Sequence, residues 1–393
     1  EMKGQLNYMP EFLYYYAGLA DKIQGETLPI DKKNMFVFSE REPLGVVAAI
    51  TPWNSPLYLT FIKLAPALVA GNTIVIKPSE HTSASLLEFV KLVEKAGFPP
   101  GVVNVITGFG KEVGDPLTSH RLVSRIAFTG GENTARHIIK NSAKNFAQLS
   151  LELGGKSPNI IFSDANLYNA AMGVIAGIFG ATGQSCVAGS RVFIQENAYE
   201  EFMDILLSRV KTIKIGDPMS PDSEIGPVAT YQQLQNIENY VELGKKEGAK
   251  LITGGKRPDH MENGWYYEPT VFEHSDHSSC ITKEEIFGPV LSVMKFKEEQ
   301  EVIELANSTD YGLAAGIWTN DIARAHRVSK SVRAGIVWVN TYRAISPIAP
   351  IGGSKLSGYG REGGLEAVHD YTQKKTVWIS TSSETMSDPF IMR

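Results

Sequence analysis

A cysteine among small residues is the most informative chemical feature of this sequence. Cys186 lies in GQSCVAG, residues 183–189, a segment that predicts a tight loop or the start of a helix. Glycine and alanine let a substrate and the backbone approach closely, and nearby backbone N–H groups would favour a thiolate. The cysteine could therefore act as a nucleophile. Taken alone, a buried and unreactive cysteine is the more common interpretation.

Two polar side chains elsewhere in the chain could assist such a nucleophile. Glu152, in LELGGKSP, ends an apolar strand, so its carboxylate is expected where open α/β sheets bind ligands. Asn54, in TPWNSP, occupies a turn bounded by prolines and could donate a hydrogen bond to a developing oxyanion. The ordinary alternatives are a strand-end salt bridge or helix cap for Glu152 and a plain asparagine turn for Asn54.

Two further segments suit a nucleotide. KPSE, residues 77–80, follows the apolar strand TIVI and places Lys77 and Glu80 where they could bind ribose hydroxyls. FTGGENTARHI, residues 128–138, predicts a strand, a glycine turn and a helix start whose N–H groups could hold a pyrophosphate. Neither segment is the GxGxxG fingerprint, and a charged surface turn or an ordinary Gly-Gly turn explains each one alone.

Alternating strands and helices must position these residues. Between Gly45 and Phe162, short β-branched runs alternate with helical patterns, which predicts βαβ units and a parallel sheet with helices on both faces. A second series, from RVFIQ at 191–195 to GIVWVN at 335–340, predicts another α/β domain. The predicted fold class is therefore α/β, and the first half is expected to bind a dinucleotide.

Composition excludes several classes of function. With 393 residues, 43% hydrophobic and 21% charged, the chain is of globular type and long enough for two or three substructures. A formal net charge of -5 gives no broad basic surface for nucleic acid. Cys186 and Cys280 are far apart and have no Cys/His cluster beside them, which argues against a disulfide framework or a zinc site. Because no apolar stretch reaches the length of a membrane span and the start lacks the order of a signal peptide, the expected location is cytoplasmic.

Seven ordered motifs together resemble the aldehyde dehydrogenase superfamily, in its hydrolytic, non-acylating branch. The resemblance covers the chain from about Pro43 to Val377. It implies a Rossmann-like cofactor domain, a second α/β catalytic domain and a small β oligomerisation arm. The motifs are, in chain order, PWN, KPSE, FTGG, LELGGKSP, GQSCVAG, EEIFGPV and PIGGSKLSGYGRE.

The resemblance implies a chemical role for three residues. Cys186 matches the family's nucleophile, which attacks the aldehyde carbon to give a thiohemiacetal and, after hydride transfer to the nicotinamide, a thioester. Asn54 and the backbone N–H of Cys186 would stabilise the oxyanion of the adduct. Glu152 matches the general base that activates water to release the carboxylic acid. The implied enzyme is an NAD(P)-dependent aldehyde dehydrogenase that requires no metal.

The resemblance also implies a set of cofactor contacts. Lys77 and Glu80 match positions that hold the adenosine ribose, and Glu285 and Phe287 match those that hold the nicotinamide ribose and ring. A carboxylate such as Glu80 should favour the free ribose hydroxyls of NAD, so NAD is the first choice, and NADP stays open because Lys77 could turn to a phosphate. The expected contacts are Thr51, Pro52, Trp53, Lys77, Ser79, Glu80, Gly110, Gly114, Phe128, Thr129, Gly130, Gly131, Thr134, Leu153, Glu285 and Phe287.

Several features depart from the family's usual pattern. Gly131, in the pyrophosphate turn, stands where serine is usual, and Ala135 stands where glycine is frequent, so the diphosphate contacts are expected to be altered. PIGG at residues 350–353 replaces PFGG and removes an aromatic ring near the substrate entrance. An N-terminal piece that family members carry, including early parts of the cofactor domain, is missing from this sequence. Gly110 and Gly114 fall in the loop against which the adenine usually lies.

Positions beside the motifs are the expected walls of the substrate tunnel. Ser55 and Gly180 are small where relatives often place aromatic residues, which predicts room for a bulky aldehyde. Arg343 near the mouth could attract an anionic aldehyde, although a solvated or interface salt bridge is the favoured interpretation. The expected substrate contacts are Ser55, Tyr58, Ile62, Gly180, Ser185, Arg343 and Ile345.

The resemblance implies a domain organisation and an assembly. Residues 1–24 and 44–155 are predicted to form the NAD-binding domain and residues 156–370 the catalytic domain. Residues 25–43 and 371–393 are predicted to form the oligomerisation arm and C-terminal strand. In relatives the arm pairs with the C-terminal strand of a neighbouring subunit, so a homodimer or homotetramer is expected.

Two other functions stay open at this point. A CoA-acylating aldehyde dehydrogenase would release the acyl group to a thiol, but Glu152 argues against that branch, which typically lacks the base. A catalytically silent relative that binds nucleotide or serves a structural role is disfavoured by the joint presence of Cys186, Asn54 and Glu152. The expected partner of the enzyme is a small-molecule aldehyde, with no nucleic acid and no membrane.

Overall fold

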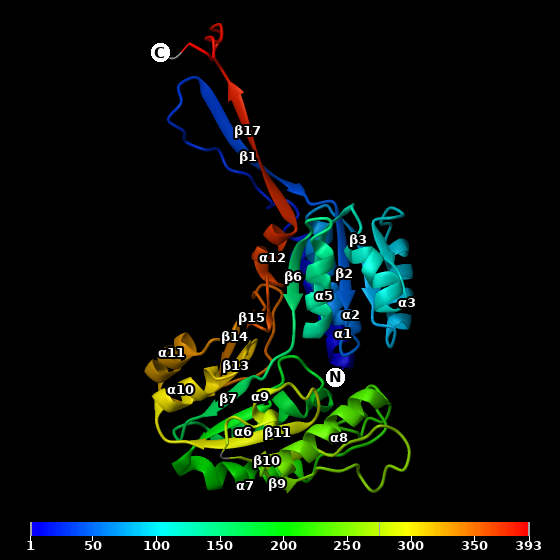
Figure 1. The fold of residues 1–393 in the computed structure, drawn as a ribbon, viewed down its shortest axis with the longest axis vertical. Helices are drawn as coiled ribbons and strands as arrows, with labels where there is room; N and C mark the ends of the chain where they lie inside the picture. Colours follow the sequence, from blue (N-terminus) through cyan, green and yellow to red (C-terminus); the bar gives the residue numbers. More distant parts are fainter. Residues whose placement is uncertain (1, 275, 392–393) are drawn as a thin grey trace.

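Two sheet-containing bodies and a long ribbon make up the molecule (Figure 1). The computed structural model describes residues 2–274 and 276–391. Residues 1, 392 and 393, at the ends of the predicted NAD-binding domain and arm, lie outside the described residues. No helix in the described ranges is both long and apolar enough to cross a membrane.

The first body is built on a six-stranded sheet with the order β16-β6-β5-β2-β3-β4. All neighbouring strands are parallel except β16, which runs antiparallel to β6. The β-branched runs fill the core, because Val47, Ile74 and Ile126 have no exposed surface. The strands are β2 (Val46–Thr51), β3 (Thr73–Pro78), β4 (Val103–Val105), β5 (Val123–Thr129), β6 (Gln148–Glu152) and β16 (Gly358–Tyr359).

Helices cover both faces of this sheet, as the sequence predicts. One face packs against side chains such as Phe12, Leu64 and Leu86, and the other against Leu117 and Ile138. The helices of the first face are α1 (Met2–Ala17), α2 (Pro56–Val69), α3 (Ser83–Lys95) and α12 (Gly364–Asp370). Those of the second face are η1 (Gly110–Gly114), α4 (Asp115–Thr118) and α5 (Glu132–Ser142).

The second body is built on a seven-stranded sheet with the order β14-β13-β7-β8-β11-β10-β9. Only β9 runs antiparallel to its neighbour, so the second predicted α/β series is confirmed. The strands are β7 (Pro158–Ile161), β8 (Arg191–Gln195), β9 (Lys250–Thr253), β10 (Thr270–Glu273), β11 (Val290–Phe296), β13 (Ala314–Trp318) and β14 (Ile336–Val339).

The helices of the second body pack on both faces of its sheet. Val174 of α6 and Phe202 of α7 belong to one buried cluster, and Val302 of α10 and Val328 of α11 to another. The helices are α6 (Leu167–Ile178), η2 (Gly180–Gly183), η3 (Glu196–Ala198), α7 (Tyr199–Val210), α8 (Tyr231–Lys246), α9 (Cys280–Lys283), α10 (Glu299–Asn307) and α11 (Ile322–Ser331). A small separate sheet pairs β12 (Tyr311–Gly312) with β15 (Ser354–Lys355).

The chain crosses back to the first body before it ends. The sequence assigns residues 156–370 to the catalytic domain, but β16 pairs with β6 of the first sheet and α12 packs on α2. Buried Ala367 and Val368 of α12 share a core with Phe12 of α1. The last elements of the predicted catalytic range therefore close the first body, because hydrophobic burial and not chain order decides where they pack.

The ribbon consists of β1 (Met35–Pro43) and β17 (Thr372–Ser380). The sequence predicts that such an arm pairs with the C-terminal strand of a neighbouring subunit, and this is wrong for these strands. They pair antiparallel with each other within one chain, from Met35 opposite Ser380 to Pro43 opposite Thr372. Both strands leave the first body at adjacent points, so pairing within the chain needs little further ordering.

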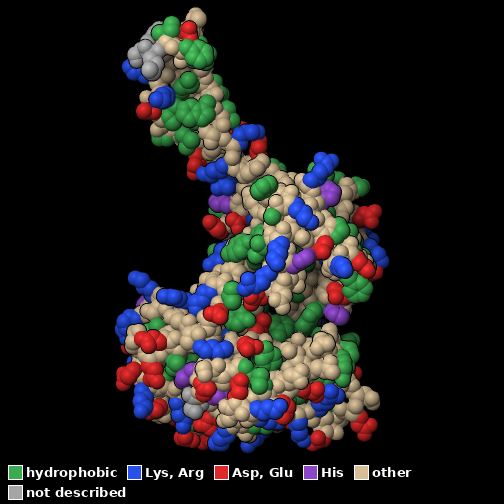
Figure 2. Space-filling model, in the orientation of Figure 1, with side chains coloured by type: hydrophobic (Ala, Val, Ile, Leu, Met, Phe, Trp, Pro, Cys, Tyr) green, Lys and Arg blue, Asp and Glu red, His purple; other side chains and the backbone are tan. Residues whose placement is uncertain are grey.

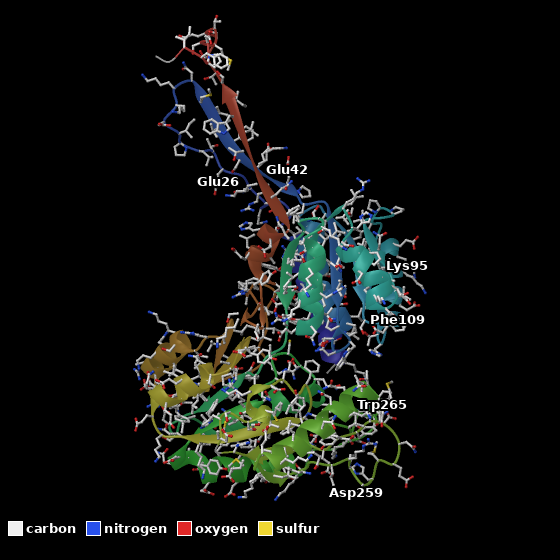
Figure 3. The ribbon with its side chains drawn as sticks, in the orientation of Figure 1. Glu26, Glu42, Lys95, Phe109, Asp259 and Trp265 are labelled. Atoms are coloured by element: carbon white, nitrogen blue, oxygen red, sulfur yellow. The ribbon has the colours of Figure 1, made fainter. Side chains whose placement is uncertain are left out.

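The ribbon carries an exposed apolar surface. Figure 2 shows hydrophobic side chains gathered along it, and Phe36, Trp378 and Ile379 are 44%, 58% and 44% exposed. Charged pairs flank this surface: Glu26 and Glu42 lie along the ribbon (Figure 3) and bind lysines of β17. An exposed apolar patch with a charged rim is typical of a protein–protein contact.

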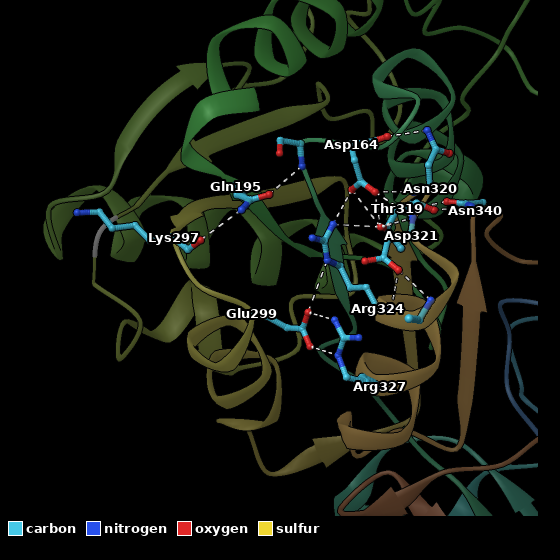
Figure 4. A network of polar contacts seen from close by, with 12 residues as sticks. Asp164, Gln195, Lys297, Glu299, Thr319, Asn320, Asp321, Arg324, Arg327 and Asn340 are labelled. Atoms are coloured by element: carbon cyan, nitrogen blue, oxygen red, sulfur yellow. Dashed lines mark hydrogen bonds and ion pairs between the residues drawn. The ribbon is translucent and has the colours of Figure 1, made fainter.

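A polar network fastens the loop after β7 to α10 and α11 in the second body (Figure 4). Asp164 accepts hydrogen bonds from the Thr319 hydroxyl at 2.8 Å and from Arg324 Nη1 at 2.7 Å. Glu299 binds Arg327 through two hydrogen bonds of 2.9 Å. The contacts of Asp164 supply hydrogen-bond acceptors for donor groups at the end of β13 and in α11.

Candidate active site

A cavity of about 670 Å³ brings the three predicted catalytic residues together. Asn54 comes from the turn between β2 and α2, Glu152 is the last residue of β6, and Cys186 lies in the loop between η2 and β8. The first two therefore come from the first body and the third from the second. The structure brings these three predicted residues together in the wall of one cavity.

The turn that carries Asn54 is held by the start of α2. Pro56 occupies the first turn of the helix, and the Leu59 N–H donates to the Ser55 carbonyl at 2.9 Å. The proline and this hydrogen bond fix the backbone at the start of α2, and so fix the direction of the turn that carries Asn54. The Asn54 Nδ2 donates to the Gln184 carbonyl at 3.1 Å, two residues before Cys186. The amide therefore faces the cysteine loop across the two bodies.

The cysteine loop depends on unusual backbone conformations. Ala181 and Thr182 have φ of 53° and 56°, and Gly183 has φ of 72°. A side chain at Gly183 would lie 2.1 Å from the Gly288 carbonyl oxygen, so only glycine fits. The Gln184 side chain accepts a hydrogen bond from the Ala229 N–H at 2.8 Å and fixes the loop from the other side.

The thiol of Cys186 has no built-in thiolate character. Burial, followed by the charges of Glu285 and Glu152, raises its pKa to about 12. The sequence predicts that backbone N–H groups favour a thiolate; those of Cys186 and Val187 do lower the pKa, but burial outweighs them. The N–H groups therefore act in the predicted direction, but burial keeps the thiol protonated, and the thiol needs a base to accept its proton.

Glu152 is suited to accept a proton. It is 7% exposed, and its Oε1 has no hydrogen-bond partner among the described residues. Burial and the nearby carboxylate of Glu362 raise its pKa well above the ordinary value, against the opposing charges of Lys63 and Arg361. A Cβ on Gly352 would lie 2.8 Å from this oxygen, so glycine leaves it room. A carboxylate with a raised pKa is a stronger base.

A buried ion pair next to Glu152 escaped the sequence analysis. Lys63 in the middle of α2 forms an ion pair with Glu362, and both side chains are almost fully buried. Lys63 also donates to the Thr129 hydroxyl at 2.7 Å. A single charge inside the apolar helix PLYLTFIKLAPALV is a signal that could have found Lys63. Glu362 lies in the motif PIGGSKLSGYGRE, where the sequence analysis gave it no role.

A second cavity, of about 710 Å³, opens at the carboxyl ends of β2, β3 and β5. It shares Thr129 with the wall of the first cavity. Most predicted cofactor contacts line it: Thr51, Pro52, Trp53, Lys77, Ser79, Glu80, Gly110, Gly114, Phe128, Thr129, Gly130, Gly131 and Thr134. The sequence analysis missed Ile50, Lys111, Asp115, Thr118, Asn133, His137 and Ile138 in the same wall.

This second cavity fits a dinucleotide. Gly131 is the N-cap of α5 and offers no capping side chain, so the first N–H groups of the helix are free for an anion. No described atom lies within 4 Å of a Cβ placed on Gly131, so space for a ligand is open there. Lys77 and Glu80 supply polar groups at the end of β3. The predicted loop at Gly110 and Gly114 is instead a π-helical turn that continues into α4.

Three predicted cofactor contacts, Phe287, Glu285 and Leu153, are not in the wall of this cavity. Phe287 meets the Trp53 ring edge to face, with centroids 5.4 Å apart. Glu285 accepts a hydrogen bond from the Gly155 N–H at 3.0 Å, and burial raises its pKa to about 7. Leu153 is buried in the core against the first sheet. Phe287 therefore contacts the first body through Trp53, and Glu285 contacts the segment that follows β6. Leu153 packs inside the first body.

The predicted substrate contacts meet in the first cavity with one exception. Ser55, Tyr58, Ile62, Ser185, Arg343 and Ile345 line it. Gly180 is not part of the described wall, because it opens the turn η2 that follows buried Phe179. Arg343 also donates to the Ala176 carbonyl at 3.2 Å.

The N-terminal helix contributes a wall that sequence reasoning did not foresee. The start of α1 lies at the junction of the two bodies (Figure 1). Its packing against α2 brings Gly4, Gln5 and Tyr8 into the cavity. No local sequence signal marks these positions, since only the docking of α1 brings them there. Ile351 lies in this wall, in line with the expected position of PIGG near the substrate entrance, and Thr129, predicted as a cofactor contact, also lines it. The other unforeseen wall residues are Leu59, Val187, Leu313, Ile336, Trp338 and Glu362.

Comparison with known proteins identifies close relatives of this chain. The sequence profile of the aldehyde dehydrogenase family matches residues 1–377. A (Z)-2-((N-methylformamido)methylene)-5-hydroxybutyrolactone dehydrogenase of Acinetobacter baylyi is 53% identical, and the match covers 100% of this chain and 80% of that protein. A betaine aldehyde dehydrogenase of Bacillus subtilis is 44% identical over 97% of this chain and 78% of that protein.

Solved structures agree with the sequence relatives. The crystal structure of a betaine aldehyde dehydrogenase from Staphylococcus aureus in complex with NAD+ superimposes with a TM-score of 0.95 at 42% identity. The superposition covers 97% of this chain and 76% of that chain. The family profile, the sequence relatives and the solved structure thus point to the same family. A cavity with a cysteine, a carboxylate and an amide next to a nucleotide-sized cleft fits that family. The chain belongs to the aldehyde dehydrogenase family and is an aldehyde-oxidising enzyme.

Proposed function

We propose that this enzyme uses NAD to oxidise an aldehyde to a carboxylic acid, with Cys186 as nucleophile, Glu152 as base and Asn54 as oxyanion donor. The observation that carries the proposal is that the three side chains line one cavity, which shares Thr129 with the cleft that fits a dinucleotide. NAD supplies the hydride acceptor when it is bound in that cleft. The charge of Glu80 favours NAD over NADP, because a 2′-phosphate would meet a carboxylate.

In the first half of the reaction a carbon–sulfur bond forms. Glu152 accepts the proton of the Cys186 thiol, and the sulfur attacks the aldehyde carbon. The carbonyl oxygen becomes an oxyanion that accepts hydrogen bonds from the Asn54 amide and the Cys186 N–H. Asn54 keeps one N–H for this purpose while the other donates to the Gln184 carbonyl. Loss of hydride from the same carbon then leaves a thioester.

In the second half of the reaction water releases the acid. Glu152, once it has lost the first proton, removes a proton from a water molecule that attacks the thioester carbon. The carbon–sulfur bond breaks, the thiol recovers a proton and the carboxylic acid leaves. Buried Glu362 lies near enough to Glu152 to raise its pKa, so its carboxylate is placed to receive the proton that Glu152 passes on, while Lys63 holds Glu362 through an ion pair.

The substrate that we propose is a medium-sized, uncharged aldehyde. The cavity of about 670 Å³ is lined mostly by apolar side chains such as Ile62, Ile336 and Trp338. The relative from Acinetobacter baylyi, 53% identical, acts by its name on a substituted hydroxybutyrolactone, which is a neutral, oxygen-rich molecule. Ser55, small where a large ring would narrow the tunnel, supports the same size class.

One experiment tests the reaction and its nucleophile together. The purified enzyme is mixed with NAD and aliphatic, aromatic and carboxylated aldehydes, and NADH absorbance and the acid product are followed, with and without CoA. We expect NADH and free acid in every productive case. Cys186→Ala should abolish turnover and leave NAD binding, measured by calorimetry, unchanged. An active Cys186→Ala variant, or an acyl-CoA product, would contradict the proposal.

The assembly, the cell compartment and the domain ranges complete the proposal. We propose a homodimer or homotetramer formed through the ribbon, supported by the exposed apolar residues Phe36, Trp378 and Ile379. Light scattering on Trp378→Glu should show a smaller particle than the parent protein.

We propose a cytoplasmic location, to be tested by cell fractionation. For the domains, we propose the NAD-binding domain, the catalytic domain and the arm as predicted, except that residues 358–370 belong to the NAD-binding domain.

A further inference from the structure

A hydrogen-bonded pair of polar side chains lies in the wall of the catalytic cavity. Gln5 of α1 and Ser55 at the start of α2 both line this cavity, and the Gln5 Nε2 donates to the Ser55 Oγ at 3.1 Å. Around them the wall is formed by rings and aliphatic chains, including Tyr58, Ile336 and Ile345. The Gln5–Ser55 pair therefore places hydrogen-bonding groups at a defined position among these apolar side chains.

The pair keeps hydrogen-bonding capacity for a ligand. The Gln5 carbonyl oxygen, its second amide N–H and the Ser55 hydroxyl proton have no protein partner within the described ranges. The two side chains therefore offer an acceptor and donors side by side. Groups that combine acceptors and donors, such as amides and hydroxyls, match this pattern, whereas an alkyl group would leave it unsatisfied.

The position of Gln5 is fixed by α1. Tyr8, one helical turn after Gln5, donates from its hydroxyl to the Ile345 carbonyl at 3.0 Å. The Tyr8 ring packs edge to face on Phe12, which packs in the same way on Tyr58. This column of rings joins α1 to the cavity wall, so the amide of Gln5 is held in place before a substrate binds.

The pair also lies close to the reacting groups. Ser55 directly follows Asn54, whose amide faces the cysteine loop. A polar group on the tail of an aldehyde could therefore reach Gln5 and Ser55 while the carbonyl lies against Cys186. Arg343 lines the same cavity and would favour an aldehyde with an anionic tail. A comparison of aldehydes with uncharged and anionic tails therefore distinguishes the two possibilities.

We infer that Gln5 and Ser55 select aldehydes whose tail carries an uncharged amide or hydroxyl group. The inference rests on the proposed function, because it assumes that the aldehyde reacts in this cavity. It goes beyond that function by naming the two side chains that set the chemistry of the tail. Sites built to bind a polar substrate group reject analogues that lack it, since their own groups are then left unpaired.

Three aldehydes of nearly the same shape test the inference: 4-formylbenzamide, 4-isopropylbenzaldehyde and 4-formylbenzoate. We expect the parent enzyme to have the highest kcat/KM for the amide. Gln5→Leu and Ser55→Ala should each lower kcat/KM for the amide about tenfold and leave the isopropyl compound unchanged or improved. Asn7→Leu, an exposed amide on the other side of α1, is the matched control and should change neither value.

Binding measurements separate this inference from the proposed function. The dissociation constants of the same aldehydes are measured by calorimetry on Cys186→Ala, with and without Gln5→Leu. A preference for the amide that Gln5→Leu removes supports the inference even if no aldehyde is turned over, in which case only the proposed function fails. Equal affinity for the amide and isopropyl compounds, or a preference for the benzoate, would overturn the inference. If the parent enzyme still oxidises these aldehydes, the proposed function would stand.

Discussion

Two clusters of charged side chains in this molecule are built on opposite principles. Beside Cys186, Lys63 forms an ion pair with Glu362 close to Glu152, all three are buried, and one oxygen of Glu152 has no hydrogen-bond partner among the described residues. At the far end of the second body, Glu299 binds the cations of Arg324 and Arg327 near the surface.

The pKa shifts of two glutamates express this difference. Burial raises the pKa of Glu152, whereas the hydrogen bonds and charge of Arg327 lower the pKa of Glu299. A lowered pKa means that the ionised form stabilises the fold, and a raised pKa means that ionisation costs stability. The peripheral network therefore supports the structure, while the buried cluster gives up stability to keep a reactive base.

Removal of Lys63 should have the largest effect. Lys63→Met leaves the buried carboxylate of Glu362 without its ion-pair partner, so we expect a loss of about 3–5 kcal/mol in the free energy of unfolding. The pKa of Glu152 should rise further because an opposing positive charge is lost. Denaturant unfolding and the pH profile of kcat measure the two effects. Lys63→Arg is the conservative control, and an unchanged pH profile in Lys63→Met would contradict a link between Lys63 and Glu152.

Neutralising Glu152 should separate activity from stability. Glu152→Gln should lower kcat by about 10²–10⁴-fold and give no burst of NADH, because the thiol of Cys186 loses the base that accepts its proton before hydride transfer. Since it removes a buried and unpaired charge, the melting temperature should rise by about 1–3 °C. Rapid mixing and calorimetry give both values. Glu299→Gln is the matched control, for which we expect a lower melting temperature and normal turnover.

The pH dependence of the two clusters should differ in the same way. Activity requires ionised Glu152, so it should be lost as pH falls through a pKa well above 4.5. The stability that Glu299 contributes is present above its unfolded pKa and is lost only as pH falls through its lower folded pKa. Activity should thus fail at a higher pH than the fold. Loss of activity and of near-ultraviolet circular dichroism at the same pH would argue against this separation.

The smallest effect is expected at the exposed end of the peripheral network. Arg327→Ala removes an ion pair whose arginine side chain is 55% exposed, so the melting temperature should fall by less than about 1 °C. The difference should shrink further at about 0.5 M salt, where screening is strong. Turnover should stay at the parent value. A change in kcat would show that the second body transmits strain from this network to the cavity.

Local sequence patterns are sufficient for the frame of the molecule and for much of the site. The β-branched runs and helical patterns predict both parallel sheets, because burial on two faces requires continuous apolar strands. Residues at the ends of such strands share one edge, which is why Glu152, Lys77 and Glu80 could be assigned to ligand cavities before the structure was known. Asn54 was found from its proline-bounded turn. The role of Cys186 follows from the resemblance of the ordered motifs, because the small residues around it alone favour an unreactive cysteine.

Other features were decided only by tertiary packing. The ion pair of Lys63 and Glu362 joins residues separated by 299 positions, and α12 returns to the first body across the whole second domain. The ribbon strands pair within the chain although the sequence suggested a partner subunit. Gln5 reaches the cavity only because α1 docks on α2, and Gly180, close to Cys186 in sequence, stays outside its wall.

The physical reason is the range of each interaction. Strand and helix patterns report which side of a segment is buried, and this depends on neighbours two to four positions away. The identity of the partner across a buried contact depends on how whole elements pack, and no local pattern encodes it. The sequence by itself therefore determined the fold class, the reaction chemistry and most of the nucleotide cleft. The tertiary structure decided the protonation of Cys186 and Glu152, the shape of the substrate wall and the pairing of the ribbon.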